Sequence, residues 1–172
     1  MSNVVNSVDE HKAYAPSELS FAVLTASDSR NDAEDESGWK IAEMVTEAGH
    51  HVIEHRVIAD EEEVIRTAVA AAVSEKGADV VVLNGGTGLA SRDVSVEAVQ
   101  PLLDRVIEGF GELFRALSYE QIGAAAMLSR AVAGVMSKSA IFVLPGSPKA
   151  VELAMAALIL PEVAHLVGQL RR

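Results

Sequence analysis

Three acidic residues stand where apolar stretches of this chain end, and their neighbours indicate what chemistry they could do. Asp28 and Asp60 each follow an apolar run, and Asp93 follows the loop 85–88, in which three of the four residues are glycine. Glycines remove the side chains that keep a ligand away from backbone amides, and such amides bind anions. Carboxylate oxygens bind divalent cations. The combination indicates a site for a polyphosphate together with a divalent cation.

A structural interpretation of the same residues stays open. A single glycine-rich loop is often only a turn between a strand and a helix. Asp60 and Asp93 also stand where an aspartate would cap the first amides of a helix. Two common nucleotide motifs are excluded, because no Gly-Lys-Ser/Thr follows the loop and position 91 is a serine where the dinucleotide pattern needs a third glycine.

A second turn, Pro145-Gly146-Ser147-Pro148-Lys149, follows another apolar run. Its prolines stiffen the chain, and a helical pattern starts directly after it. Free amides at the start of a helix bind anions, and Ser147 and Lys149 could add to such a site. A purely structural turn remains the alternative.

The spacing of apolar residues along the chain predicts the elements that position these residues. Strands are predicted over 19–25, 51–58, 80–84 and 140–144, and helices over 37–48, 61–75, 94–103, 112–121 and from 150 onward, with a kink at Pro161. The segment 124–134 fits either a helix or the start of a strand. Residues 80–83 are apolar without polar alternation, which is typical of a parallel strand covered on both faces.

This order predicts a single-domain, doubly wound α/β fold with a mostly parallel sheet and helices on both faces. We expect an N-terminal arm over 1–17 and the α/β domain over 18–172. In such sheets ligands bind beyond the carboxyl ends of the strands. Asp28, Asp60, the glycine loop and the Pro145–Lys149 turn should therefore meet at one edge.

Composition excludes several other classes. The formal charge is −11 and no basic cluster is interleaved with aromatic residues, so a nucleic-acid partner is not expected. The chain has no cysteine, which excludes disulfides, thiolate metal sites and a cysteine nucleophile. The first residues lack a signal-peptide core, and the longest apolar segment, 153–160, is too short to span a membrane and is interpreted as a buried helix. A cytoplasmic protein without a membrane partner is expected.

The histidines and the acidic run 32–36 carry no functional prediction. The five histidines show no metal-binding pair at helical spacing within a site, so all five are interpreted as surface or core residues. The acidic run is interpreted as a solvated loop.

Several motifs together resemble the MogA/MoaB family of molybdenum cofactor biosynthesis proteins. They are, in chain order, Asn84-Gly85-Gly86-Thr87-Gly88 with Arg92-Asp93-Val94, then Gly109-Phe110-Gly111-Glu112, then Leu144-Pro145-Gly146-Ser147-Pro148-Lys149. The form of residues 128–134 is most similar to the MoaB branch. The resemblance runs from about residue 21 to the end. It implies a molybdopterin-binding α/β domain that assembles as a homo-trimer or hexamer, with residues 107–117 (notably Phe110, Leu113 and Phe114) partly buried between subunits.

The resemblance also implies an activity and a set of site residues. Active family members join molybdopterin to AMP from ATP with Mg²⁺ and release pyrophosphate. Asp60 and Asp93 would be the catalytic acids and magnesium ligands. The nucleotide would contact Gly85, Gly86, Thr87, Gly88 and Asp28, and molybdopterin would contact Ser129, Arg130, Pro145, Gly146, Ser147, Pro148 and Lys149. Asn84 departs from the threonine that is frequent in the family.

Two functions follow from this resemblance. The first is molybdopterin adenylylation, which the retained Arg92-Asp93 pair favours. The second is a catalytically silent molybdopterin-binding or carrier protein of the same fold. Other proteins of the molybdenum cofactor pathway are possible partners in either case.

Overall fold

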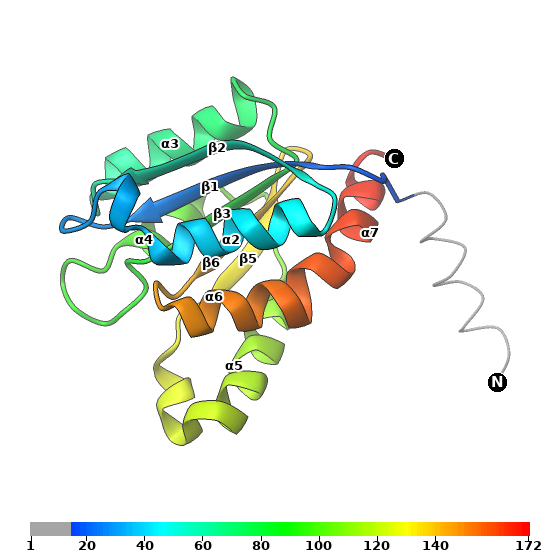
Figure 1. The fold of residues 1–172 in the computed structure, drawn as a ribbon. Helices are drawn as coiled ribbons and strands as arrows, with labels where there is room; N and C mark the ends of the chain where they lie inside the picture. Colours follow the sequence, from blue (N-terminus) through cyan, green and yellow to red (C-terminus); the bar gives the residue numbers. More distant parts are fainter. Residues whose placement is uncertain (1–14) are drawn as a thin grey trace, which may run out of the picture.

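A six-stranded sheet forms the centre of the computed structural model, which describes residues 15–172 (Figure 1). The strands are β1 (Ser20–Ala26), β2 (His51–Ile58), β3 (Val80–Asn84), β4 (Arg105–Val106), β5 (Val132–Met136) and β6 (Ser139–Leu144), in the order β2-β1-β3-β6-β5-β4. Strands β2, β1, β3 and β6 run parallel, whereas β5 and β4 are antiparallel to their neighbours. The predicted mostly parallel sheet is confirmed. Of the predicted arm 1–17, residues 1–14 lie outside the described residues.

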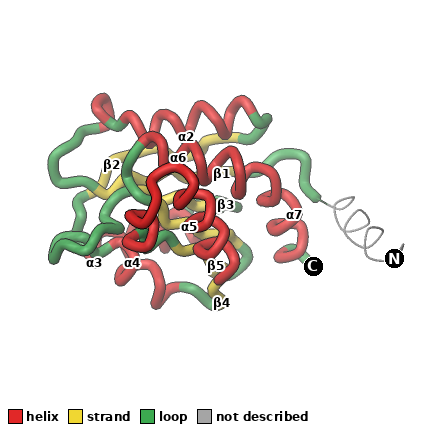
Figure 2. Tube along the Cα trace, turned by 90° about the horizontal axis from the view of Figure 1, so that it is seen from below, coloured by secondary structure: helices red, strands yellow, loops and turns green. Residues whose placement is uncertain are grey.

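Helices cover both faces of the sheet, as expected for a doubly wound fold (Figure 2). They are α2 (Glu36–Glu47), α3 (Glu62–Ser74), α4 (Ser95–Val99), α5 (Glu108–Ile122), α6 (Pro148–Ala154) and α7 (Leu160–Leu170). One core layer joins α2, α5, α6 and α7 to the sheet face that carries Phe21, Val82 and Phe142. The other joins α3 and α4 to the face that carries Leu24 and Leu83. Because both faces are covered, every residue of β3 and β6 is buried.

Two predicted helices have different bounds in the structure. The helix predicted over 94–103 is only the short α4, followed by a 3-10 turn (Gln100–Leu102), because Pro101 lacks the amide that a continuing α-helix needs. Helix α5 begins at Glu108 instead of 112 and includes Gly111. A side chain at Gly111 would meet the backbone oxygen of Ala131 at 3.0 Å, so close packing against β5 explains a glycine inside this helix.

The ambiguous segment 124–134 is divided between two structures. Residues Gly123–Leu128 form the 3-10 helix η3, and β5 begins at Val132. Together α5 and η3 make a long excursion between β4 and β5 that projects away from the sheet (Figure 1).

The last helix is continuous from Pro148 to Leu170, with a π-helical turn, η4 (Met155–Ile159), directly before Pro161. A wider turn accommodates a proline ring that would otherwise clash with the preceding carbonyl. The run is therefore long and apolar enough to cross a membrane by length and composition, contrary to the expectation from segment 153–160 alone. Val151, Met155, Ile159 and Val163 are almost fully buried, whereas Ala156 and Ala157 are exposed, so the predicted buried helix is buried on one side only.

Candidate functional site

The loops that carry the predicted site residues meet at the carboxyl ends of the parallel strands. The chain leaves β1 and β3 at the point where the strand order reverses, which is where open α/β sheets bind ligands. The amide of Ser27 donates to the carbonyl of Ile58 at 2.9 Å, and the amide of Gly85 donates to the carbonyl of Leu144 at 3.0 Å. The glycine loop therefore lies between the Asp28 loop and the Pro145–Lys149 turn.

The carboxylates of Asp60 and Asp93 do not cap α3 or α4, so the interpretation of these two residues as helix caps is wrong. The N-cap positions of α3 and α4 are Glu61 and Val94, and neither helix has a side-chain cap. The Asp93 carboxylate instead accepts a hydrogen bond from the amide of Ala90 at 2.9 Å, within its own loop. Asp60 donates its backbone amide to Asp28 Oδ1 at 3.0 Å. The Asp60 carboxylate faces the glycine loop at Gly86, and the backbone of Val94 hydrogen-bonds to this carboxylate.

The environment of Asp60 disfavours its charge. Burial raises the pKa of the Asp60 carboxyl, and the negative charges of Asp28 and Asp93 raise it further. By contrast, hydrogen bonds from Arg92 and from the Asp60 amide lower the pKa of Asp28. Asp60 Oδ1 is buried without a hydrogen-bond partner, and so is Ser95 Oγ at the start of α4. A cation or a proton donor bound at this position would offset the buried charge of Asp60 and give the two unpartnered oxygens a partner.

The glycines of the loop are required by how closely these acids approach it. A β-carbon on Gly86, whose φ is +62°, would lie 2.6 Å from Asp60 Oδ1 and 2.4 Å from Ser95 Oγ. A β-carbon on Gly88 would lie 2.6 Å from Asp93 Oδ2. Anything bound to the loop amides would therefore lie beside two carboxylates.

This arrangement fits a magnesium ion that shares its ligands with phosphate oxygens. Within residues 15–172 no group of three or more His, Asp or Glu side chains is placed to hold a metal ion by itself. Magnesium is commonly held by one or two carboxylates together with substrate phosphates. Asp60 and Asp93 could supply the two carboxylates.

Arg130 hydrogen-bonds to the backbone of the glycine loop and of Asp93. Its guanidinium donates to the carbonyls of Thr87 at 3.1 Å and Asp93 at 2.9 Å, and forms an ion pair with Glu97. This hydrogen-bonded pairing lowers the pKa of Glu97. Arg130, expected on the pterin side, thus lies against the loop expected to bind the nucleotide. Its neighbour Ser129 Oγ accepts from the amide of Ala131 at 3.5 Å.

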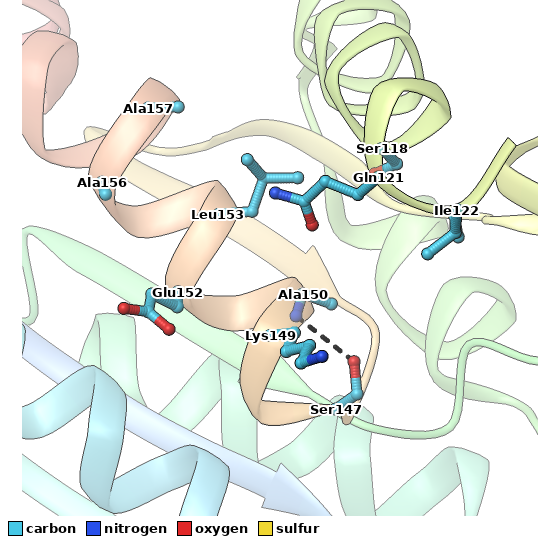
Figure 3. Close-up of a pocket in the computed structure, with 10 residues that line it drawn as sticks. All are labelled: Ser118, Gln121, Ile122, Ser147, Lys149, Ala150, Glu152, Leu153, Ala156 and Ala157. Carbon is cyan, nitrogen blue, oxygen red and sulfur yellow. Dashed lines mark hydrogen bonds between the residues drawn. The ribbon is translucent and has the colours of Figure 1, made fainter.

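The Pro145–Lys149 turn lies beside a large cavity (Figure 3). The cavity has a volume of about 670 Å³ and lies between the start of α6 and the end of α5. Ser147 caps α6 by accepting from the amide of Ala150 at 3.3 Å. Figure 3 shows Ser147 and Lys149 together at the start of α6, with Gln121 reaching over from α5. An anion-binding side chain and hydrogen-bonding groups thus face a space large enough for a small molecule.

Sequence reasoning missed one group of residues beneath these loops. Asp35, expected in a solvated loop, is fully buried. Its Oδ2 accepts from Thr25 Oγ1 at 2.6 Å and lies 2.8 Å from His55 Nε2. The Trp39 and His55 rings pack nearly at right angles, with centroids 4.4 Å apart. An acid three residues before a glycine, Asp35-Glu36-Ser37-Gly38, was the available signal, because this spacing suits an N-cap.

Comparison with known proteins agrees with the motifs and the fold. A family profile described as "Probable molybdopterin binding domain" matches residues 22–165. Molybdenum cofactor biosynthesis protein B of Bacillus subtilis (strain 168) is 47% identical over 167 residues, which cover 96% of this chain and 98% of that protein. A crystal structure of Molybdenum cofactor biosynthesis protein B matches with a TM-score of 0.89 at 48% identity, over 92% of this chain and 99% of the other. The tungsten cofactor synthesizing protein MoaB from Pyrococcus furiosus matches with a TM-score of 0.81 at 37% identity, over 92% and 100%.

Proposed function

Because this chain belongs to the molybdopterin-binding family of molybdenum cofactor biosynthesis proteins, we propose that it transfers AMP from ATP to molybdopterin. The expected resemblance to MogA/MoaB is confirmed, and the relatives assign the chain a role in molybdenum cofactor biosynthesis. The adenylyl transfer itself, with ATP and Mg²⁺, is the step that we add.

The observation that carries the proposal is the close packing of Asp60 and Asp93 against the glycine loop. In the reaction, an oxygen of the terminal phosphate of molybdopterin attacks the α-phosphorus of ATP. A new P–O bond forms, the bond to the β-phosphate breaks, and pyrophosphate leaves with the bonding electrons. Such a transfer depends mainly on positioning the two phosphates and stabilising their charge. Asp60 and Asp93 would hold a magnesium ion, which neutralises phosphate oxygens when bound.

The remaining site residues have distinct tasks in this proposal. The amides of Gly85 to Gly88 bind the nucleotide phosphates, and Arg130 keeps that loop in place through Thr87 and Asp93. Asp28 holds Arg92 and the backbone of Asp60. Lys149 and Ser147 bind the anionic end of molybdopterin beside the cavity of α5 and α6.

Molybdopterin binding without transfer is the second candidate. One observation favours it: the Asp93 carboxylate already accepts a hydrogen bond from Ala90, which leaves it less free to bind a cation. The Bacillus subtilis relative is, moreover, named as a biosynthesis protein and not as a transferase.

We further propose that the protein works as a trimer or hexamer. An apolar groove of about 580 Å³ lies between α5 and α7, lined among others by Ile107, Leu113, Leu158 and Leu166. Leu113 is 56% exposed. Phe110 and Phe114, which the sequence placed in a subunit contact, are instead buried in the chain's own core, because Phe110 packs on Phe142 of the sheet with ring centroids 5.3 Å apart. A cytoplasmic location stays a prediction.

Mixing the protein with molybdopterin, ATP and Mg²⁺ and measuring pyrophosphate tests the transfer. The matched variant is Asp93→Asn, whose amide oxygen can still accept from Ala90 and so preserve the loop. We expect pyrophosphate from the unchanged protein and at least about a hundredfold less from the variant, the scale of losing a charge-stabilising group. Molybdopterin binding without any pyrophosphate from the unchanged protein would establish the second candidate instead.

A further inference from the structure

We propose that Asp35 is a positioning residue that holds the glycine loop and the Pro145–Lys149 turn in a fixed relation. This inference rests on the proposed function for its catalytic consequence, but its structural part can be tested separately. Asp35 is fully buried, so it would act through its neighbours and not by touching a substrate.

A chain of hydrogen bonds leads from Asp35 to the glycine loop. Thr25 Oγ1 donates to Asp35 Oδ2 at 2.6 Å and accepts from Asn84 Nδ2 at 2.8 Å. Asn84 is the last residue of β3 and directly precedes Gly85. Asn84 Nδ2 also donates to the carbonyl of Leu24 at 3.2 Å, whereas Asn84 Oδ1 is buried without a partner. The Asn84 amide is thus held only through its nitrogen, and Thr25 provides the shorter of its two bonds.

A second chain of contacts leads from Asp35 to the other loop. Asp35 Oδ1 caps α2 by accepting from the amide of Gly38 at 2.9 Å. One residue earlier, Ser37 Oγ donates to the carbonyl of Gly146 at 2.8 Å. Gly146 in turn packs on Gly85, since a β-carbon on Gly146 would lie 3.1 Å from Gly85 Cα. The two loops therefore touch each other, and each is tied to the same carboxylate.

The packing around Asp35 leaves little freedom for this carboxylate. His55 Nε2 lies 2.8 Å from Asp35 Oδ2, and both side chains are nearly inaccessible to solvent. A β-carbon on Gly38 would lie 1.9 Å from Asp35 Oδ2 and 2.5 Å from His55 Nε2, so only glycine fits at that position. A buried carboxylate with hydrogen bonds to both oxygens has one stable orientation. It joins the ends of β1 and β3 and the middle of β2 to the start of α2.

Thr25→Val tests the role because it removes the hydroxyl that links Asp35 to Asn84 and keeps the branched shape. The separate variant Thr25→Ser retains the hydroxyl and should have the same properties as the unchanged protein. Ser139→Ala is the matched control, because it removes a buried hydroxyl that donates to the carbonyl of Ala78 at 2.7 Å, at the opposite end of the parallel strands. If Thr25→Val does not fold, Asn84→Ser supplies the same test, since serine is too short to reach Thr25 Oγ1.

The first measurement is amide hydrogen exchange, which needs no activity. We expect the Gly85 amide, which donates to the carbonyl of Leu144 at 3.0 Å, to exchange at least about tenfold faster in Thr25→Val than in the unchanged protein, and Ser139→Ala to leave it unaltered. The second measurement is adenylyl transfer. Thr25→Val should lower kcat by about tenfold to a hundredfold while the Kd values of ATP and molybdopterin change by less than about threefold, as expected when bound groups are slightly misplaced.

Unaltered exchange at Gly85 in Thr25→Val, or equal effects of Thr25→Val and Ser139→Ala, would overturn the positioning role. If the unchanged protein transfers AMP, an equal kcat in Thr25→Val would also overturn the positioning role. If the unchanged protein releases no pyrophosphate, only the proposed function fails, and the exchange rates alone decide the role of Asp35.

Discussion

Replacing Gly86 by alanine tests how closely Asp60 and Ser95 approach the glycine loop. Two costs can be worked out from the structure. Gly86 has a φ of +62°, and an L-residue in that left-handed region costs about 1 to 2 kcal/mol. The new β-carbon would also meet Ser95 Oγ at 2.4 Å and Asp60 Oδ1 at 2.6 Å. Moving each of these side chains off its rotamer costs about 0.5 to 1.5 kcal/mol.

The free energy of unfolding of Gly86→Ala should therefore fall by about 2 to 5 kcal/mol. Gly77→Ala is the matched control, because Gly77 has a φ of +69° but nothing lies within 4 Å of an added β-carbon. It should lose only the backbone cost of about 1 to 2 kcal/mol. Urea unfolding measures both values, and the difference between the two variants reports the contact with Asp60 and Ser95.

The same pair of variants separates stability from activity. At a temperature where both are folded, Gly86→Ala should lose adenylyl transfer, because the displaced Asp60 no longer faces the loop, whereas Gly77→Ala should retain it. Equal losses of stability in the two variants would refute the close approach of Asp60 and Ser95 to Gly86. Full transfer by Gly86→Ala would refute the assignment of Asp60 to the site.

Three further predictions follow from the charges and surfaces. Asp60→Asn should raise the free energy of unfolding at pH 7, because the raised pKa of Asp60 means that its ionised form destabilises the fold. This gain in stability should disappear as the pH falls towards 3.8, the ordinary pKa of an aspartate, because Asp60 is then protonated. Urea titrations at several pH values measure the difference. Lys149→Ala should weaken molybdopterin binding by about 1.5 to 3 kcal/mol in calorimetry and leave ATP binding nearly unchanged. Lys138→Ala is the control for the loss of a surface charge. Weaker ATP binding with unchanged molybdopterin binding would mean that the two ends of the site are exchanged. Leu113→Asp should convert a trimer or hexamer into monomers in light scattering, and an unchanged protein that is already monomeric at micromolar concentration would contradict the proposed assembly.

The parallel part of the fold and the place of the site could be predicted from the sequence. Strands β1, β3 and β6 are continuous apolar runs, because both faces of a parallel sheet are covered, and this pattern is visible locally. Gly85 and Pro145 mark where β3 and β6 end. Since the carboxyl ends of parallel strands lie at one edge, strand assignment alone was enough to predict that Asp28, Asp60, the glycine loop and the Pro145–Lys149 turn meet there.

Tertiary structure decided the features that depend on contacts between distant residues. The two residues of β4, Arg105 and Val106, are exposed and too few to show a period, so only their pairing with β5 defines the strand. Arg130 reaches a loop 43 residues earlier in the chain. No local pattern reports such a contact.

Asp35 shows the same limit most clearly. Within the sequence it is one of several acids in a polar run, and acids in such runs are usually solvated. Its burial depends on Thr25, ten residues before it, and on His55, twenty residues after it, which the folded sheet brings to the same carboxylate. The sequence therefore determined which elements bring the predicted site residues to one edge of the sheet, whereas the packing of β1, β2 and α2 decided which carboxylate is buried next to that edge.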